Sequence, residues 1–354
     1  MSPPCVVVLG GEAAPERMRP PRLGRLAGRA TVRHADDSSL AGLLPAADVL
    51  LVWDFTSDAV RRAWPGAGPR PGWVHTASAG VDRLLFPELV HSPTLVTNAR
   101  GVFDIPIAEY VAGLIIAMAR EFPVSWDLQR RRVWRHRETR TVAGSRAVVV
   151  GSGGIGRETA RTLRALRVTV DLVGRQERTA DPEFGRVHPA GALPGLLPLA
   201  DWVVCAAPLT PATRGMFDAA AFALMKEGAR FVNVGRGAHV VETDLIAALR
   251  SGRLAGAALD VFAEEPLPAG SPLWELPGVL LSPHMSGDTP GWEQTLADQF
   301  LDNFDRWVAG EPLHQVVDKQ LGYAAASGTE PGAGAGAGAA TGDAGEEHTE
   351  DLPA

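Results

Sequence analysis

The feature that most constrains this chain is a glycine-rich loop near its middle. The residues VVVGSGGIG at 148–156 place the pattern G-x-G-x-x-G directly after a run suited to a buried strand, and the helix-like segment 157–167 follows. In such a loop Gly151 permits a tight turn, Gly153 lets the backbone approach a pyrophosphate, and Gly156 permits close packing of helix on strand. Because free N–H groups at a helix N-terminus favour negative charge, the loop predicts a dinucleotide-binding unit. The candidate cofactor-binding residues of the loop are Gly151, Gly153, Gly154, Ile155 and Gly156.

The next predicted strand, 168–174, indicates which dinucleotide fits. A carboxylate at the end of this strand would accept hydrogen bonds from the adenosine ribose hydroxyls and would repel a 2′-phosphate. Here the strand ends at Gly174, Arg175 follows, and Asp171 lies inside the strand. Arg175, with Arg178 nearby, is suited to bind a 2′-phosphate through paired hydrogen bonds. We therefore expect NADPH to be the preferred cofactor, with NAD as the alternative.

Two series of short apolar runs predict two parallel sheets. Strands that alternate with helices are typical of parallel sheets packed on both faces. The first series comprises residues 5–9, 48–53, 73–77 and 94–98, and the second comprises 146–151, 168–174, 201–207, 229–235, 256–262 and 279–283. A length of 354 residues suits two domains, each with its own core. The expected fold class is α/β, with two Rossmann-like, doubly wound parallel-sheet domains.

Two helices and a tail complete the predicted organisation. Residues 105–120 are apolar with little charge, which suits a helix buried between layers or subunits. Residues 290–309 carry large apolar side chains at intervals of three and four, which is typical of an amphipathic helix. These side chains are Trp292, Leu296, Phe300, Phe304 and Trp307. Residues 322–354 hold a Gly/Ala repeat and six acids, so we expect a disordered acidic tail.

Composition argues against several kinds of partner. The net charge is −7, and because the tail holds six acids with no Lys or Arg, the rest of the chain sums to −1. The arginines are spread without a dense block, so we expect no nucleic-acid partner. No apolar stretch reaches the roughly 18 residues that span a bilayer, and the N-terminus lacks a secretory signal pattern. Two cysteines, Cys5 and Cys205, are too few for a Cys-rich zinc site. We expect a cytoplasmic protein with no metal and no membrane partner.

Three segments downstream of the glycine loop resemble one known family. They are CAAPLTPATRGMF at 205–217, FVNVGRGAHVVETDLIAALRSGRLAGAALDVFAEEPLP at 231–268 and LSPHMSG at 281–287. Their order and spacing resemble the D-isomer-specific 2-hydroxyacid dehydrogenases, over a match from about Val74 to Trp307. The resemblance implies a substrate-binding domain at 1–97, completed by 290–321, and an NAD(P)-binding domain at 98–289. It also implies a cleft between the domains, whose closure would exclude water.

The resemblance assigns three catalytic positions, Arg236, Glu265 and His284. Histidine titrates near neutrality, so His284 suits the transfer of a proton to and from a carbonyl oxygen. A carboxylate on its second ring nitrogen would fix the orientation of the ring, and Glu265 is the candidate. Its neighbour Glu264 differs from it only in lacking the family's Glu-Pro match. Arg236 follows the C-terminal end of a predicted strand, where its planar guanidinium would hold the substrate carboxylate.

The resemblance also implies further contacts to cofactor and substrate. Asp260 resembles the residue that receives the nicotinamide carboxamide. The backbone N–H groups of Ala79 and Gly80 would hold the substrate carboxylate, together with Arg236 and His284. The remaining cofactor-lining positions are Pro208, Thr213, Val234, Ser286 and Gly287.

These features predict an oxidoreductase that reduces a short 2-keto acid, of the glyoxylate or hydroxypyruvate class, to the D-2-hydroxy acid. A short-chain dehydrogenase would need Tyr-x-x-x-Lys, which neither Tyr110 nor Tyr323 provides. Two alternatives remain. One is a dinucleotide-sensing binding protein of the corepressor kind, and the other is an enzyme like D-3-phosphoglycerate dehydrogenase. The residues Val81-Asp82-Arg83 depart from the Asp-Asn pattern of the latter.

The residues after the 105–120 helix predict an oligomer. Val124, Trp126, Val133 and Trp134 add more apolar surface than one domain needs to bury. The family that the chain resembles is usually dimeric through this region. We therefore expect a homodimer.

Overall fold

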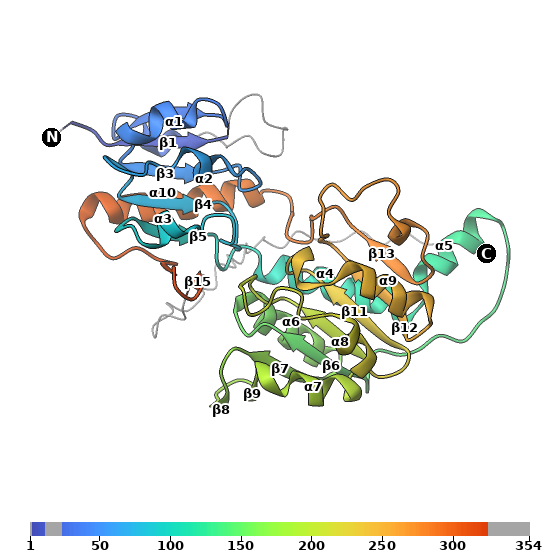
Figure 1. Cartoon of the computed structure of the whole chain (residues 1–354). Coiled ribbons are helices and arrows are strands. Elements are labelled where there is room, and N and C mark those ends of the chain that lie inside the picture. Colours follow the sequence, from blue (N-terminus) through green and yellow to red (C-terminus); the bar gives the residue numbers. More distant parts are fainter. Residues whose placement is uncertain (1, 11–22, 325–354) are drawn as a thin grey trace, which may run out of the picture.

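The computed structural model describes residues 2–10 and 23–324, which form two α/β units joined by two chain crossings (Figure 1). In the first unit a five-stranded parallel sheet has the order β2-β1-β3-β4-β5. Its strands are β1 (Cys5–Leu9), β2 (Thr31–Ala35), β3 (Val49–Val52), β4 (Trp73–Thr76) and β5 (Leu95–Asn98). Its helices are α1 (Leu40–Leu43), α2 (Ala59–Ala63), α3 (Pro87–Val90) and α10 (Trp292–Ala309).

The second unit is built on an eight-stranded sheet in the order β13-β12-β11-β10-β6-β7-β9-β8. Every pair in it is parallel except the antiparallel β8–β9 pair at one edge. Its strands are β6 (Arg146–Val150), β7 (Thr169–Gly174), β8 (Arg178–Asp181), β9 (Gly185–Pro189), β10 (Trp202–Cys205), β11 (Ala229–Asn233), β12 (Leu254–Leu259) and β13 (Val279–Leu281). Its helices are α4 (Asp104–Ala119), α5 (Phe122–Arg130), α6 (Gly154–Ala165), α7 (Leu193–Leu196), α8 (Ala219–Leu224) and α9 (Glu242–Arg250).

The strands at the centre of each sheet follow from their apolar, β-branched sequences. Val149 in β6 is paired in register with Leu172 of β7 and Val204 of β10, and all three side chains are buried. Such runs are buried on both faces, as parallel sheets between helices require. Each of the ten runs predicted from the sequence contains a strand, and the α/β fold class with two parallel sheets is confirmed.

Three strands at a sheet edge or next to one were not predicted. β2, with the sequence TVRHA, is largely exposed, and β8 and β9 are mostly polar. An edge strand is covered on fewer sides than a central one, so its sequence need not be an apolar run. These segments therefore lack the apolar run that predicts a strand.

The predicted amphipathic helix at 290–309 is α10, which returns the chain to the first unit. Phe300 stacks on Trp73 of β4 with ring centroids 5.2 Å apart, and both side chains are buried. Trp292 and Trp307, at the two ends of the predicted stripe, pack against the same core cluster but are only partly buried. The first sheet thus depends on a helix almost 200 residues further along the chain for one of its faces.

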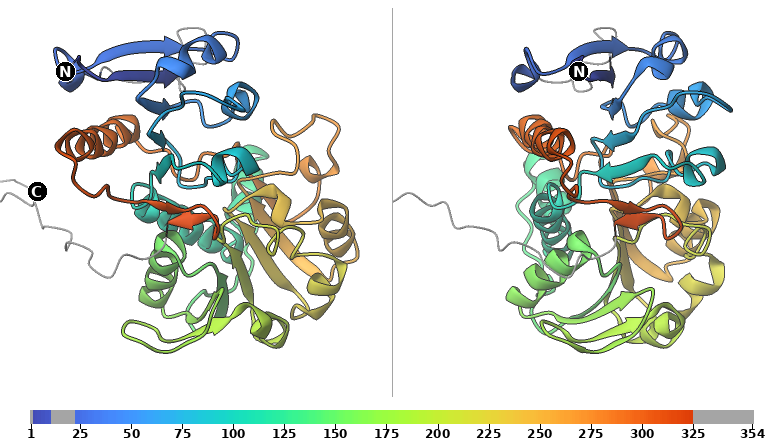
Figure 2. Two further views of the ribbon diagram at one scale, coloured as in Figure 1. Left: turned by 60° about the vertical axis from the view of Figure 1, so that its left-hand side comes forward. Right: turned by 90° about the vertical axis from the view of Figure 1, so that its left-hand side faces the viewer.

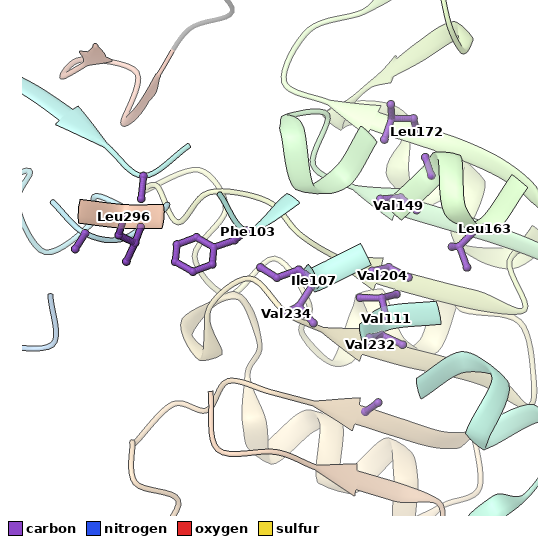
Figure 3. Packing of buried hydrophobic residues seen from close by; sticks show 14 of the residues in the cluster. Phe103, Ile107, Val111, Val149, Leu163, Leu172, Val204, Val232, Val234 and Leu296 are labelled. Atoms are coloured by element: carbon purple, nitrogen blue, oxygen red, sulfur yellow. The ribbon is translucent and has the colours of Figure 1, made fainter. Parts of the chain in front are cut away.

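The predicted helix at 105–120 is α4, and it packs against other elements of the same chain. Most of its apolar residues are buried, and it lies against α6. Figure 3 shows Phe103 between Leu296 of α10 and Ile107 of α4, so one apolar cluster continues from the first unit into the second. Ile105 is the large apolar side chain of α4 that remains exposed, at 59%.

The last described residues correct the predicted start of the tail. Val317–Asp318 (β14) and Tyr323–Ala324 (β15) form an antiparallel pair, and Val316 bridges to Thr97 of β5. Tyr323 supplies an aromatic ring that lies beside Arg175, although the sequence places it in the predicted tail. Figure 2 shows this orange-red hairpin at the junction of the two units. The rest of the predicted tail, 325–354, lies outside the described residues.

Candidate active site

The glycine loop joins β6 to α6, and two of its glycines are required by close packing. A Cβ on Gly156 would collide with the carbonyl oxygen of Gly151. Gly151 itself has φ +123°, and a Cβ there would collide with the backbone of Ala206. These positions perform the turn and the helix–strand contact that the sequence predicts for them.

Of the remaining glycines, Gly153 leaves the N-terminus of α6 open, whereas Gly154 lies beside an acidic side chain. A Cβ on Gly153 would meet no atom within 4 Å, and no side chain caps the helix there. Gly154 lies against the carboxylate of Asp104, which fills the space that a Cβ would occupy. The first N–H groups of a helix lack intrahelical partners, so this end fits the pyrophosphate of a dinucleotide.

The end of β7 presents Arg175 to solvent. Asp171 forms an ion pair with Arg146, which donates to both of its carboxylate oxygens, at 2.6 and 3.1 Å. Arg178 lies 3.4 Å from a carboxylate oxygen of Asp181. Arg175 forms no ion pair within the described part of the chain and meets the ring of Tyr323 instead. Of the two arginines expected to face a 2′-phosphate, Arg175 is thus the one without a carboxylate partner.

Arg236 follows β11 and reaches into the first unit. Its Nε donates to Asp82 Oδ1 at 3.1 Å, and its Nη1 donates to the Gly235 carbonyl at 2.9 Å. Its Nη2 lies against Gly80, where a Cβ would collide with it. The structure therefore brings together Arg236 and the predicted carboxylate-binding loop, although 156 positions separate Gly80 from Arg236 in the sequence.

A buried histidine holds the backbone of Arg236. His239 is fully buried, and its Nδ1 lies 3.0 Å from both the N and the O of Arg236. Burial lowers the pKa of His239, which favours the neutral ring. A neutral Nδ1 without a proton accepts the Arg236 N–H, so His239 fixes the turn from which Arg236 projects.

His284 and Glu265 form the predicted pair. His284 Nδ1 lies 2.8 Å from Glu265 Oε2, and Glu265 Oε1 accepts from the Phe262 N–H at 3.0 Å. Burial raises the pKa of Glu265, but the hydrogen bond and charge of His284, with the charge of Arg236, outweigh burial and leave it below its usual range. Glu264, the alternative left open by the sequence, is exposed, and the carboxylate that meets His284 Nδ1 is that of Glu265. The geometry selects Glu265.

Asp260 shapes the loop that carries His284. Its side chain is buried, with Oδ1 accepting from the Ser282 hydroxyl and the Met285 N–H and Oδ2 accepting from the Ser286 N–H. Its carbonyl accepts the N–H of His284, which has the uncommon φ of +52°. The predicted contact of Asp260 with the nicotinamide carboxamide stays a prediction.

The predicted carboxylate-binding loop is tied down by its carbonyl groups. Asn98 donates to the carbonyl of Ala79 at 2.6 Å, and Ser78 donates to that of Gly80 at 2.7 Å. Both donors are buried. The orientation of the Ala79–Gly80 backbone is thereby fixed next to Arg236.

The other predicted cofactor-lining residues fall into two places. Thr213 donates to the Pro208 carbonyl at 2.7 Å and closes a turn after β10. Val234, Ser286 and Gly287 are buried beside the His284 loop and the end of β11, and Gly287 packs against the Phe103 ring.

No group of three His, Cys, Asp or Glu residues suited to a metal is found among the described residues. Within residues 2–10 and 23–324, no helix is long and apolar enough to cross a membrane.

Sequence reasoning missed two residues that hold Arg236. Asp82 carried a signal, because it lies in the segment that departs from the family's Asp-Asn pattern, but its partner is 154 residues away. His239 lies three residues after Arg236, where a side chain can fold back on the turn. Nothing in a single sequence separates such a histidine from an ordinary core residue.

A glycine loop suited to a dinucleotide and a histidine–carboxylate pair in the same unit are the features expected of a nicotinamide-dependent oxidoreductase. A family model described as "D-isomer specific 2-hydroxyacid dehydrogenase, NAD binding domain" matches residues 112–286. The chain belongs to the D-isomer-specific 2-hydroxyacid dehydrogenase family and is an NAD(P)-dependent oxidoreductase, as the sequence predicted.

Relatives and solved structures agree on this family. A glyoxylate/hydroxypyruvate reductase A from Serratia proteamaculans is 33% identical over 259 residues, which are 71% of this chain and 81% of the relative. A D-3-phosphoglycerate dehydrogenase from Pongo abelii is 32% identical over 70% of this chain, but the match spans only 46% of that protein. The crystal structure of an NADPH-dependent glyoxylate/hydroxypyruvate reductase from Sinorhizobium meliloti, in complex with NADP and sulfate, has a TM-score of 0.77 at 29% identity. That comparison covers 91% of this chain and 100% of the other.

Proposed function

We propose that this protein reduces a short 2-keto acid, of the glyoxylate or hydroxypyruvate class, to the D-2-hydroxy acid with NADPH as reductant. The observation that carries the proposal is the pair His284–Glu265, 2.8 Å apart, on the unit whose Arg236 reaches the Ala79–Gly80 loop of the other. A proton donor and a carboxylate-binding cation are the two groups that keto-acid reduction requires of the protein.

In this mechanism His284 supplies the proton. Glu265 holds Nδ1, so Nε2 is the nitrogen that remains to protonate the carbonyl oxygen of the substrate. The carboxylate of Glu265 stabilises the charged imidazolium before transfer, and the ring becomes neutral afterwards. NADPH, when bound, supplies the hydride that adds to C2 of the keto acid. Oxidation of the hydroxy acid uses the same groups in reverse.

In the same mechanism Arg236 and the loop Ala79–Gly80 bind the substrate carboxylate. Two of the guanidinium donors already engage Asp82 and the Gly235 carbonyl, which fixes the plane of the group. Nη2, beside Gly80, is directed to the place where a carboxylate would also meet the loop backbone. A planar, fixed guanidinium orients a carboxylate through paired hydrogen bonds.

The preference for NADPH is supported by the end of β7. Asp171 is held by Arg146, so it does not offer the carboxylate that would select the ribose hydroxyls of NADH. Arg175 is exposed at the position where the adenosine 2′-phosphate would lie. The Sinorhizobium meliloti reductase, whose structure contains NADP, agrees with this choice.

The homodimer proposal is supported by exposed aromatic surface after α4. Trp126 in α5 is 57% exposed, and Trp134 in the following segment is fully exposed. Val124 and Val133 are also exposed beside them. Light scattering at micromolar concentration should give twice the mass of one chain, and a monomer would contradict the proposal.

A panel of 2-keto acids assayed with purified protein tests the proposed reaction. Glyoxylate or hydroxypyruvate should be reduced, and hydroxypyruvate should give the D-product on chiral chromatography. Oxidation of D-3-phosphoglycerate as the fastest reaction would favour the phosphoglycerate dehydrogenase alternative. Dinucleotide binding without turnover of any 2-keto acid would favour the binding-protein alternative.

A further inference from the structure

The C-terminal segment crosses from the first unit to the dinucleotide-binding unit and ends at the proposed phosphate site. It starts on the first sheet, where Val317 is buried and Val316 bridges to Thr97. Lys319 anchors it there, because its Nζ donates to the carbonyls of Leu89, Ser92 and Thr94 at 3.2, 2.6 and 3.0 Å. Three backbone acceptors on one ammonium group fix the position of this segment.

The segment then meets both units at Gly322. A Cβ added to Gly322 would lie 3.4 Å from Thr210 Cγ2 and 3.6 Å from Leu85 Cδ1, so the backbone here runs close to both side chains. Leu85 belongs to the first unit, and Thr210 belongs to the turn that Thr213 closes in the second. The next residue, Tyr323, pairs with Asp318 of β14 and so follows the anchored part of the segment.

Tyr323 places its ring beside Arg175. The guanidinium carbon lies 6.0 Å from the ring centroid, which is within the range of a cation–π contact. A ring covers a face of the planar guanidinium, whereas hydrogen bonds leave from its edge. Tyr323 thus restrains Arg175 without using its donors or neutralising its charge.

We propose that Tyr323 is a specificity-determining residue of the dinucleotide site, which orients Arg175 so that the guanidinium edge binds the 2′-phosphate of NADPH. This inference rests on the proposed NADPH preference. It assigns a role to a residue that the sequence had placed in the tail. It also makes the first unit, through Lys319, a contributor to cofactor selection in the second.

Direct binding by calorimetry tests the inference on the full chain. The probes are adenosine 2′,5′-bisphosphate, which carries the 2′-phosphate, and 5′-AMP, which lacks it. Tyr323→Ala should weaken the bisphosphate by about three- to fivefold and leave 5′-AMP nearly unchanged, since an exposed cation–π contact has roughly this magnitude. Tyr323→Phe keeps the ring and should bind the bisphosphate as the natural chain does.

Two truncations provide matched controls. A chain ending at Ala324 keeps Tyr323 and should bind the bisphosphate normally, whereas a chain ending at Leu321 keeps Lys319 and should behave as Tyr323→Ala. Unchanged bisphosphate binding by Tyr323→Ala, or equal weakening of both probes, would overturn the inference. Tyr323-dependent binding in a protein that reduces no 2-keto acid would support the inference while contradicting the proposed reaction.

Discussion

At the proposed catalytic end of the site, Arg236 and His284 each pair with a carboxylate, whereas Arg175 at the proposed adenosine end meets an aromatic ring. The carboxylate of Glu265 also accepts a hydrogen bond from the Phe262 N–H. Arg175 is exposed and has no carboxylate partner in the part of the chain that the structure describes. The two ends therefore hold their cations by different physical means.

The difference follows from what each end must bind. Catalytic groups need fixed geometry, and a carboxylate partner provides it at the cost of some positive charge. A 2′-phosphate carries more negative charge than a substrate carboxylate, so a cation that meets it is most effective when no acid neutralises it. An aromatic ring restrains the guanidinium and leaves its charge intact.

Removing the proton donor should give the largest effect, and this effect should be on turnover and not on cofactor binding. His284→Ala should lower kcat by at least about a hundredfold, because it removes general acid catalysis. NADPH binding, measured by tryptophan fluorescence, should stay within about twofold, since no cofactor phosphate depends on this ring. Near-full turnover by the variant would contradict the mechanism.

Removing the cation at the other end should affect cofactor binding first. Arg175→Ala should raise KM for NADPH by about tenfold and leave KM for NADH little changed, because a charged hydrogen-bond pair to phosphate is lost. Arg178→Ala is the matched control, since Arg178 is already paired with Asp181. Equal effects of both substitutions would show that the end of β7 does not select the cofactor.

The carboxylate that positions Arg236 should give a smaller effect confined to substrate. Asp82→Asn keeps the shape of the side chain but weakens the hydrogen bond to Nε, so KM for the keto acid should rise by about threefold to tenfold. The KM for NADPH should be unchanged in steady-state assays. A variant whose kcat falls while both KM values stay constant would place Asp82 in another role.

The smallest expected effect is that of pH on the rate of keto-acid reduction. The lowered pKa of Glu265 means that its stabilising contribution is present above its ordinary titration range and is lost only as pH falls through the lower folded value. The rate of keto-acid reduction should therefore not fall between pH 7 and pH 5, because Glu265 stays ionised and the protonated form of His284 is the one that reacts. A loss of activity with a midpoint at the ordinary pKa of a glutamate or above would contradict the pairing of Glu265 with His284.

The two ends also differ in how far the sequence predicted them. Arg236, Glu265 and His284 lie in short motifs whose neighbours are fixed by local turns, and the structure brings these motifs to one place. Arg175 contacts Tyr323, and Arg236 contacts Asp82. Each pair joins residues roughly 150 positions apart in the chain, which no local pattern encodes.

The same reasoning applies to the fold. Central strands such as β6 were predicted because burial on both faces demands an apolar run. The strands β2 and β8, at sheet edges, and β9, next to one, lack an apolar run and were missed. The predicted tail began too early because Tyr323 is a single aromatic residue whose packing partners lie elsewhere in the chain.

Steady-state kinetics with hydroxypyruvate and both cofactors tests the central claim most directly. Because an unpaired Arg175 favours the 2′-phosphate and no carboxylate is free at the end of β7, kcat/KM with NADPH should exceed that with NADH by at least about tenfold. A preference for NADH, or no reduction of hydroxypyruvate or glyoxylate with either cofactor, would contradict the account.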